Sequence, residues 1–170
     1  MNYEFEVGGS LDDEDRPVRI IEGGYVCKFL YYETLHSSDP ENQKIRLRFQ
    51  IVEQGDSLGI CLWKYYKVRK VSPPVGRGGG FVPKPLGDFY DDYCTSFGPP
   101  ERLDRIPMQT KYSKYLWSCE VETVTKNFKR QKRSEHTQYS VIRSITLLRP
   151  IEPDKKSSNP SFYKPNLPKG

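Results

Sequence analysis

The sequence predicts a mainly β fold, a five-stranded barrel with one short helix between strands three and four and flexible tails. Five segments are rich in β-branched and aromatic residues, and polar and apolar side chains alternate along the clearest of them. Clusters of Gly, Pro, Asn and Asp separate these segments, as expected of turns. The chain has 170 residues, enough for one domain with a hydrophobic core.

The N-terminal part of the chain predicts an arm followed by the first strand. We assign residues 1–19 to an acidic N-terminal arm because they include an unbroken acidic run at 12–15. Residues 18–21 are a candidate short strand. After a Gly-Gly turn, the aromatic run 25–32 predicts the first full strand, and residues 36–42 have the composition of a loop.

The second strand, residues 44–51, has the strictest alternation in the chain. One side carries Ile45, Leu47, Phe49 and Ile51, and the other carries Lys44, Arg46, Arg48 and Gln50. Because successive side chains of a strand point to opposite faces, one face should build the core and the other should be cationic. Residues 54–57 form a turn, and residues 59–71 predict the third strand.

The second half of the chain supplies the helix and two more strands. Residues 72–87 are so rich in proline and glycine that we expect neither helix nor strand there, and the length of this loop indicates function or mobility. Residues 88–97 predict a short helix with Asp88 as its N-cap and a glycine as its stop. Strands four and five are predicted at 115–125 and 138–148.

The order of these elements predicts a particular barrel. Three strands, a helix and two further strands are the layout of the OB-fold, which we assign to residues 20–150. A β-sandwich or an SH3-like barrel fits the same strands. The C-terminal tail, residues 151–170, is rich in Pro, Ser, Asn and Lys, and we expect it to become ordered only against a partner.

Charge is distributed unevenly along the chain. There are 27 basic and 22 acidic residues, but six of the acids lie in the first 15 residues, which contain no base. The other 16 acids against 27 bases give residues 16–170 a net charge of +11, which suits a polyanionic partner. The mean hydropathy is −0.75, and we find no membrane-length apolar run and no export signal. We therefore expect a soluble, cytoplasmic protein without a membrane partner.

Catalytic and metal sites have little support in the sequence. The four cysteines are widely spaced, at Cys27, Cys61, Cys94 and Cys119. Without a Cys-x-x-Cys pair they predict reduced thiols, three in strands and one in the helix, rather than a zinc site. Asp88, Asp91 and Asp92 share the short helix, where acidic residues favour the N-terminus without binding a metal. We expect no catalytic residue, no metal and no cofactor. A metal-dependent nuclease, which would use such a carboxylate cluster, remains a third possible function after the two given at the end of this subsection.

The third strand combines aromatic and basic side chains. If Ile60 and Leu62 point inward, the outward residues are Trp63, Tyr65, Lys67 and Arg69. Aromatic rings stack on nucleic-acid bases and cations hold phosphates, so this combination suits single-stranded nucleic acid. In an antiparallel pair, Arg46 and Arg48 of the second strand would lie beside these residues. The alternative is that Trp63 and the tyrosines belong to the core and that lysine side chains extend around them.

The loop between strands four and five has the highest density of positive charge. Its bases are Lys126, Lys129, Arg130, Lys132 and Arg133, and Phe128 lies among them. Like charges at this density repel one another unless solvent or a polyanion surrounds them, and an aromatic ring in their midst suits base stacking. A flexible hairpin tip or a protein-docking patch is the alternative.

Two other segments have features that could serve nucleic-acid binding. Arg77-Gly78-Gly79 resembles a fragment of an RGG segment, although a plain linker has the same composition. The acidic arm could cover the basic face until nucleic acid displaces it. A solvated tail is the alternative for the arm.

Several short motifs carry a family resemblance. They are Gly24-Tyr25, the alternating residues at 45–51 followed by Val52-Glu53, Gly55 and Gly59, and the runs 104–107, 123–125 and 139–142. Over residues 23–150 the chain thereby resembles small OB-like single-stranded-DNA-binding proteins of phages and integrating mobile elements. The resemblance implies a role in the DNA metabolism of such elements. Bacterial single-strand-binding proteins end in an acidic tip that recruits partners, whereas residues 164–170 read Lys-Pro-Asn-Leu-Pro-Lys-Gly, which puts such recruitment in doubt.

The sequence thus predicts non-enzymatic binding of single-stranded nucleic acid, DNA in the first place, through a basic groove and aromatic stacking. The expected contact residues are Arg46, Arg48, Trp63, Tyr65, Lys67, Arg69, Lys126, Phe128, Lys129, Arg130, Lys132 and Arg133. RNA stays open as the ligand because contacts to the 2′-OH leave no signature in composition. A homo-oligomer and a protein partner bound through the tails also stay open. The alternative function is a protein-interaction adaptor or regulator that docks through the basic loop and the Pro/Gly segments.

Overall fold

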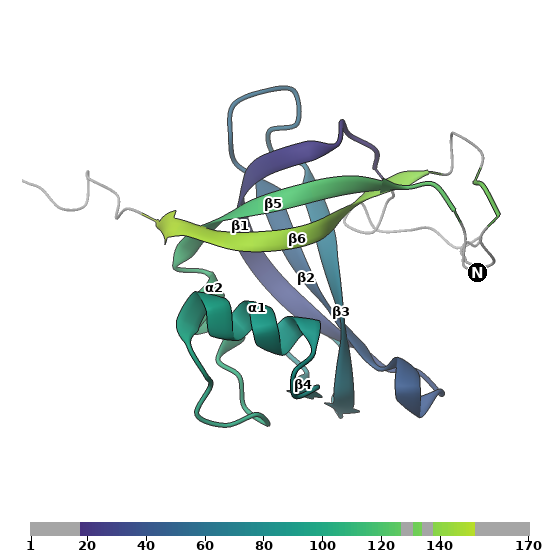
Figure 1. Ribbon diagram of the computed structural model, residues 1–170, viewed down its shortest axis with the longest axis vertical. Helices are drawn as coiled ribbons and strands as arrows, with labels where there is room; N and C mark the ends of the chain where they lie inside the picture. Colours follow the sequence, from purple (N-terminus) through teal and green to yellow (C-terminus); the bar gives the residue numbers. More distant parts are fainter. Residues whose placement is uncertain (1–17, 127–130, 134–137, 152–170) are drawn as a thin grey trace, which may run out of the picture.

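The computed structural model describes residues 18–126, 131–133 and 138–151. Within them, six antiparallel strands form one sheet in the order β4-β3-β2-β1-β5-β6, which curls into a half-barrel (Figure 1). The strands are β1 (Gly23–Leu35), β2 (Lys44–Ile51), β3 (Cys61–Ser72), β4 (Gly80–Pro83), β5 (Tyr115–Val124) and β6 (Tyr139–Pro150). The predicted mainly β class is confirmed, but the strand count of five is wrong.

The additional strand, β4, lies in the segment 72–87, where the sequence predicts neither helix nor strand. It pairs with β3 at the edge of the sheet, and Phe81 is buried against Phe89 with ring centroids 5.5 Å apart. Pro83 ends the strand, and a proline is tolerated at a sheet edge because no further strand needs its missing N–H. The glycines and prolines around these four residues conceal the strand from a reading of composition.

One helix was predicted and is found at the predicted residues. This helix, α1 (Asp88–Phe97), ends at Gly98, whose φ of +82° suits a glycine. Gly87 is its N-cap, so the assignment of Asp88 to that position is wrong by one residue. Two short helices were not predicted, η3 (Pro40–Asn42) and α2 (Met108–Tyr112). No helix in the described part of the chain is long and apolar enough to cross a membrane.

Residues 18–21 do not form the short strand that the sequence allows. They still bind the edge of β6, where the Ser140 N–H donates to the Val18 carbonyl at 2.8 Å. The Ile20 N–H in turn donates to Ser140 Oγ, also at 2.8 Å. Val18 and Ile20 pack against the core, so the chain enters the fold beside the first residues of β6.

The core is built on the inner face of β2, as its alternation predicts. Ile45, Leu47 and Phe49 are fully buried there. Trp117 of β5 is also buried, and its ring stacks on Tyr112 of α2 with centroids 4.8 Å apart. The Trp117 indole N–H donates to the Tyr112 carbonyl at 3.1 Å, which satisfies the one polar group of this side chain.

The sheet closes only in part. Strands β3 and β6 approach one another without being neighbours in the hydrogen-bonded order, and α1 packs against both of them (Figure 1). Tyr66 of β3 donates a 2.6 Å hydrogen bond to Asp92 of α1, which fixes the helix to the sheet. The helix therefore covers the inner side of the curled sheet.

Two isoleucines with opposite burial test the assignment of the core. Ile45 has no exposed surface, and Ile21 is 82% exposed. Ile45→Val should lower the free energy of unfolding by about 0.5–1.5 kcal/mol because it removes a packed methylene. Ile21→Val removes the same group from solvent and should change stability by less than about 0.5 kcal/mol. Chemical denaturation measures both variants, and equal effects would contradict the assignment.

Candidate nucleic-acid interface

A bulge in β1 turns two side chains to the outer face of the sheet. Before the bulge, Phe29 lies opposite Phe49, and both point into the core. The register shifts between Phe29 and Tyr31, after which Tyr31 lies opposite Arg48 and Glu33 lies opposite Arg46. Without the extra residue, strict alternation would place Tyr31 and Glu33 on the inner face with Phe29.

At its other edge, β2 pairs with β3, and the side chains of β3 that point outward are the predicted ones. Trp63 lies opposite Arg48, and Tyr65 lies opposite Arg46. Leu62 is buried and Tyr65 is 41% exposed, so the orientation predicted for the third strand is confirmed. The arginines of β2 thus lie between side chains of β1 and β3 on one face.

Trp63 is the centre of the contacts on this face. The guanidinium carbons of Arg46 and Arg48 lie 3.8 and 4.5 Å from the centroid of its ring. Tyr31 approaches the same ring edge-on, with centroids 5.9 Å apart. Arg48 lies between the two aromatic residues and is only 6% exposed. The π face of Trp63 offsets part of the desolvation of the buried guanidinium group.

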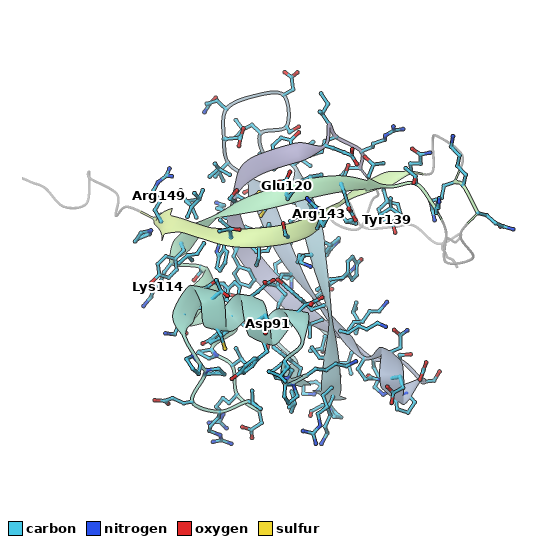
Figure 2. The ribbon with its side chains drawn as sticks, in the orientation of Figure 1. Asp91, Lys114, Glu120, Tyr139, Arg143 and Arg149 are labelled. Atoms are coloured by element: carbon cyan, nitrogen blue, oxygen red, sulfur yellow. The ribbon has the colours of Figure 1, made fainter. Side chains whose placement is uncertain are left out.

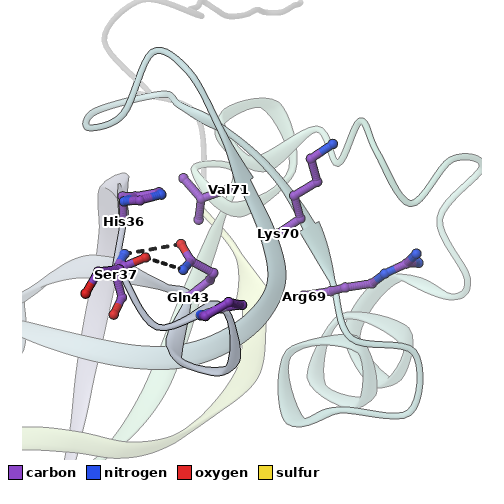
Figure 3. Close-up of a pocket in the computed structure, with 8 residues that line it drawn as sticks. His36, Ser37, Gln43, Arg69, Lys70 and Val71 are labelled. Atoms are coloured by element: carbon purple, nitrogen blue, oxygen red, sulfur yellow. Dashed lines mark hydrogen bonds between the residues drawn. The ribbon is translucent and has the colours of Figure 1, made fainter.

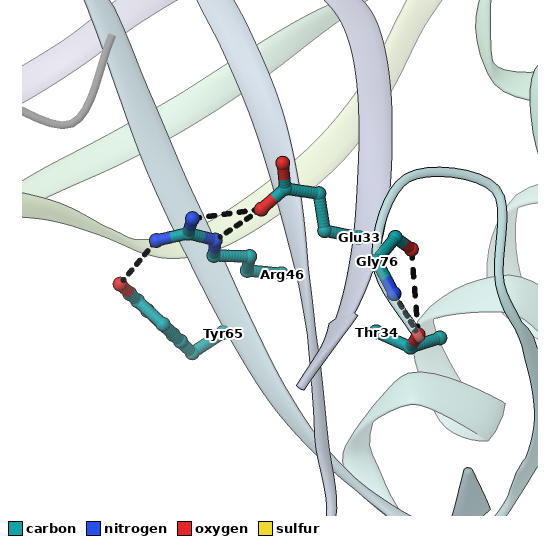
Figure 4. A network of polar contacts seen from close by, with 5 residues as sticks. All are labelled: Glu33, Thr34, Arg46, Tyr65 and Gly76. Carbon is teal, nitrogen blue, oxygen red and sulfur yellow. Dashed lines mark hydrogen bonds and ion pairs between the residues drawn. The ribbon is translucent and has the colours of Figure 1, made fainter. Parts of the chain in front are cut away.

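Arg46 is held by a polar network (Figure 4). Glu33 Oε1 accepts from Arg46 Nε at 2.9 Å and lies 2.7 Å from its Nη2, while Nη1 donates to the Tyr65 hydroxyl at 3.5 Å. Burial acts to lower the pKa of Arg46, but Tyr65 and Glu33 outweigh it and raise the pKa above its usual value. The guanidinium group therefore stays charged and in a defined position.

The glycine-rich segment between β3 and β4 docks along β1. The Thr34 N–H donates to the Gly76 carbonyl at 2.9 Å, and the Gly78 N–H donates to the Tyr32 carbonyl at 3.2 Å. Gly76 and Gly78 have φ values of +121° and +74°, which side-chain-bearing residues rarely adopt. The contact of Gly76 with Thr34 is visible beside the arginine network in Figure 4.

This docking brings Arg77 onto the outer face. Arg77 pairs with Glu33 in an isolated β-bridge, and its guanidinium carbon lies 3.6 Å from the Tyr31 ring centroid. We call the assembled set the outer-face cluster: Tyr31, Glu33, Arg46, Arg48, Trp63, Tyr65 and Arg77. The sequence predicted four of its members and missed Tyr31, Glu33 and Arg77 as site residues. The Arg-Gly-Gly motif was the available signal for Arg77.

The base of the β5–β6 hairpin contacts the start of β6, a strand that approaches β3. The Arg133 guanidinium lies 5.2 Å from the ring of Tyr139, the first residue of β6 (Figure 2). Burial and the neighbouring Tyr65 raise the pKa of the Tyr139 hydroxyl, whereas Arg133 acts to lower it. Tyr139 thus contacts Arg133 of the predicted loop and lies on the strand that approaches β3. Lys126 and Lys132 face one another across the hairpin, and the predicted residues Phe128, Lys129 and Arg130 lie outside the described residues.

The two remaining predicted residues of β3 lie farther along the strand. Lys67 is exposed opposite Lys44, and Arg69 is exposed at a second bulge. Arg69 and Lys70 border a pocket of about 290 Å³ beside η3. Figure 3 shows that both cationic groups point away from Gln43. The side-chain amide of Gln43 is hydrogen-bonded to the backbone N–H and carbonyl of Ser37. These cations do not converge on one anion position.

The four cysteines and Asp92 lie outside the outer-face cluster. No disulfide joins the four cysteines, and they lie as predicted, three in strands and one in α1. Burial raises the pKa of the Asp92 carboxyl against the effect of its Tyr66 hydrogen bond, so Asp92 belongs to the contact between α1 and the sheet. Among the residues with described positions, no three His, Cys, Asp or Glu side chains form a group that could hold a metal ion.

Comparison with known proteins gives this chain no relative. No family model, no curated protein and no solved structure matches it. Only the geometry of the outer-face cluster, the charge of the chain and the fold therefore support a function.

Two neighbouring glycines test whether the segment that carries Arg77 is tightly docked on the sheet. A Cβ atom on Gly79 would lie 2.3 Å from Thr34 Oγ1 and 2.7 Å from the Pro74 carbonyl, whereas one on Gly80 would meet only the Ser72 side chain at 3.6 Å. Gly79→Ala should therefore displace the segment and lower the free energy of unfolding by about 1–3 kcal/mol. Gly80→Ala should have a much smaller effect. Thermal and chemical denaturation compare the two, and equal stability would contradict tight docking.

Proposed function

We propose that this protein binds single-stranded nucleic acid, with single-stranded DNA as its preferred ligand, and that it is not an enzyme. The outer-face cluster is the observation that carries the proposal. Three guanidinium groups and three aromatic rings lie together on one face of the sheet. Single-stranded nucleic acid offers the matching groups, anionic phosphates and flat bases, in a regular repeat.

The positions of these side chains suggest a division of roles. Trp63 and Tyr31 are partly exposed, and each is already in contact with a guanidinium group. A base that stacks on such a ring would gain about 1–3 kcal/mol. Arg77 is exposed at the border of the cluster and is suited to a phosphate oxygen, while the more buried Arg46 and Arg48 support the rings.

The strand order also favours this function. Without β4, the order β3-β2-β1-β5-β6 with α1 between β3 and β5 in sequence agrees with an OB-like barrel. Proteins with that architecture bind oligonucleotides on the sheet face and adjacent loops. We propose that the basic loop, residues 126–133, contacts the phosphates of the nucleic-acid strand where the strand extends past Tyr139. Arg133 of this loop contacts Tyr139.

Fluorescence anisotropy tests the proposal directly. The intact protein is titrated into a labelled oligo-dT strand of about 20 nucleotides over a series of salt concentrations, with duplex DNA and single-stranded RNA as competitors. We expect binding that weakens with salt, resists the duplex and is weaker for RNA. Absence of binding even at low salt would overturn the proposal, and the basic face would then be assigned to protein docking.

Removal of the central ring tests the stacking role. Trp63→Ala should weaken oligo-dT binding by about 1–3 kcal/mol, or about five- to 150-fold. Tyr90→Ala is the matched control because Tyr90 is a partly exposed aromatic residue on α1, outside the outer-face cluster. Circular dichroism checks that both variants are folded. Equal affinity of the two folded variants would show that Trp63 does not stack on a base.

A matched pair of arginines tests the phosphate role. Arg77→Gln should weaken binding and reduce the slope of log affinity against log salt by about 0.7, the value for one single-strand phosphate contact. Arg149→Gln removes the same charge at the opposite end of β6 from Tyr139 (Figure 2) and should leave the slope unchanged. The anisotropy series measures both slopes. Identical slopes would exclude Arg77 from the contact.

A further inference from the structure

We propose that the acidic N-terminal arm docks on the outer-face cluster of its own chain and competes there with the nucleic acid. The segment concerned is residues 1–17, which precede the described part of the fold. The competition rests on the proposed function, whereas docking of the arm does not. Three observations support the proposal: the place where the fold begins, the reach of the arm and the charges that would meet.

The described chain begins beside the basic face. The Val18 carbonyl accepts from Ser140 N–H at 2.8 Å, and the neighbouring residue Tyr139 contacts Arg133. Strand β6, which begins at Tyr139, also approaches β3, the strand that carries Tyr65 and Trp63. An arm attached at Val18 therefore starts beside Arg133 and Tyr139, on the side where β6 approaches β3.

The reach of the acidic run matches the size of the cluster. An extended residue spans at most about 3.6 Å, so Asp15 can lie up to about 11 Å from Val18 and Asp12 up to about 22 Å. The distance from Tyr65 to Trp63 along β3 is about 7 Å. The acidic run 12–15 is therefore long enough to span both of these side chains.

The charges and the chemical groups are complementary. Residues 1–15 contain six acids and no base, and the acids are Glu4, Glu6, Asp12, Asp13, Glu14 and Asp15. In the cluster, Arg46 is already paired with Glu33 and Arg48 is buried, so the exposed cation is Arg77. At the base of the β5–β6 hairpin, Lys126 and Lys132 are exposed as well. The arm also contains the aromatic residues Tyr3 and Phe5, so it presents anions and flat rings, the two groups by which a nucleic-acid strand would bind.

The expected effect on affinity follows from competition. If the arm occupies the cluster in about nine molecules of ten, only about one in ten is free to bind, and the apparent affinity is about tenfold lower than the intrinsic affinity. Salt should release the arm as well as the nucleic acid because both contacts are electrostatic. The arm should therefore also lower the salt dependence of nucleic-acid binding.

The test uses the full chain and a charge-matched control. The arm variant carries Asp12→Asn, Asp13→Asn, Glu14→Gln and Asp15→Asn. The control variant carries Glu41→Gln, Asp56→Asn, Asp91→Asn and Glu101→Gln, four exposed acids outside the outer-face cluster. Both variants lose four negative charges, so an effect of net charge alone would be the same in each.

The first measurement needs no nucleic acid. In ¹H–¹⁵N NMR spectra, the indole N–H of Trp63 should shift in the arm variant, and high salt should move the wild-type signal in the same direction. The indole N–H of Trp117 is an internal reference because it is buried and bonded to Tyr112. The control variant should leave both signals in place. An unchanged Trp63 signal in the arm variant would overturn the docking proposal.

The second measurement is oligo-dT binding by anisotropy. The arm variant should bind about tenfold more tightly than wild type and clearly more tightly than the control variant. Equal gains in the two variants would show a general charge effect and overturn the competition. A shift of the Trp63 signal without oligo-dT binding by any form would support docking and reject the proposed function, so the two proposals fail separately.

Discussion

Strand β2 must satisfy two environments at once, and the core and the candidate site both depend on it. Its pleat sends Ile45, Leu47 and Phe49 into the interior, where they are fully buried. The same pleat sends Arg46 and Arg48 to the outer face, between β1 and β3. A shift of one residue in register would exchange the two sets, burying the arginines and exposing the core. The hydrophobic effect therefore fixes the position of the cationic groups as firmly as it fixes the core.

Arginines in the middle of a sheet face require compensation for lost hydration. Arg48 obtains it from the ring of Trp63, and Arg46 obtains it from Trp63 and from the carboxylate of Glu33. Each contact also restricts a long side chain that would otherwise move through many rotamers. The result is a face whose aromatic and cationic groups are held in position. For the ligand that we propose, such a face lowers the entropy lost on binding.

Local sequence determined a large part of this structure. The alternation in 44–51 predicted both faces of β2, because a period of two has only one arrangement that buries four apolar residues. The apolar spacing and glycine stop at 88–98 predicted α1, and the phase of β3 placed Trp63 and Tyr65 on the outer face. These predictions succeeded where the physical cause, burial or a backbone preference, acts within a few neighbouring residues. The charge of the chain and its acidic arm are likewise properties of the sequence alone.

Tertiary structure decided the rest. The bulge in β1 depends on pairing with β2, so Tyr31 and Glu33 reach the outer face only in the folded sheet. The strand β4 exists because β3 offers an edge, and Arg77 is placed by hydrogen bonds between the glycine segment and β1, more than 40 residues away in sequence. The approach of β6 to β3 requires the curvature of the whole sheet. Each of these contacts joins residues that are distant along the chain, and the energy that selects them appears only when the strands are assembled.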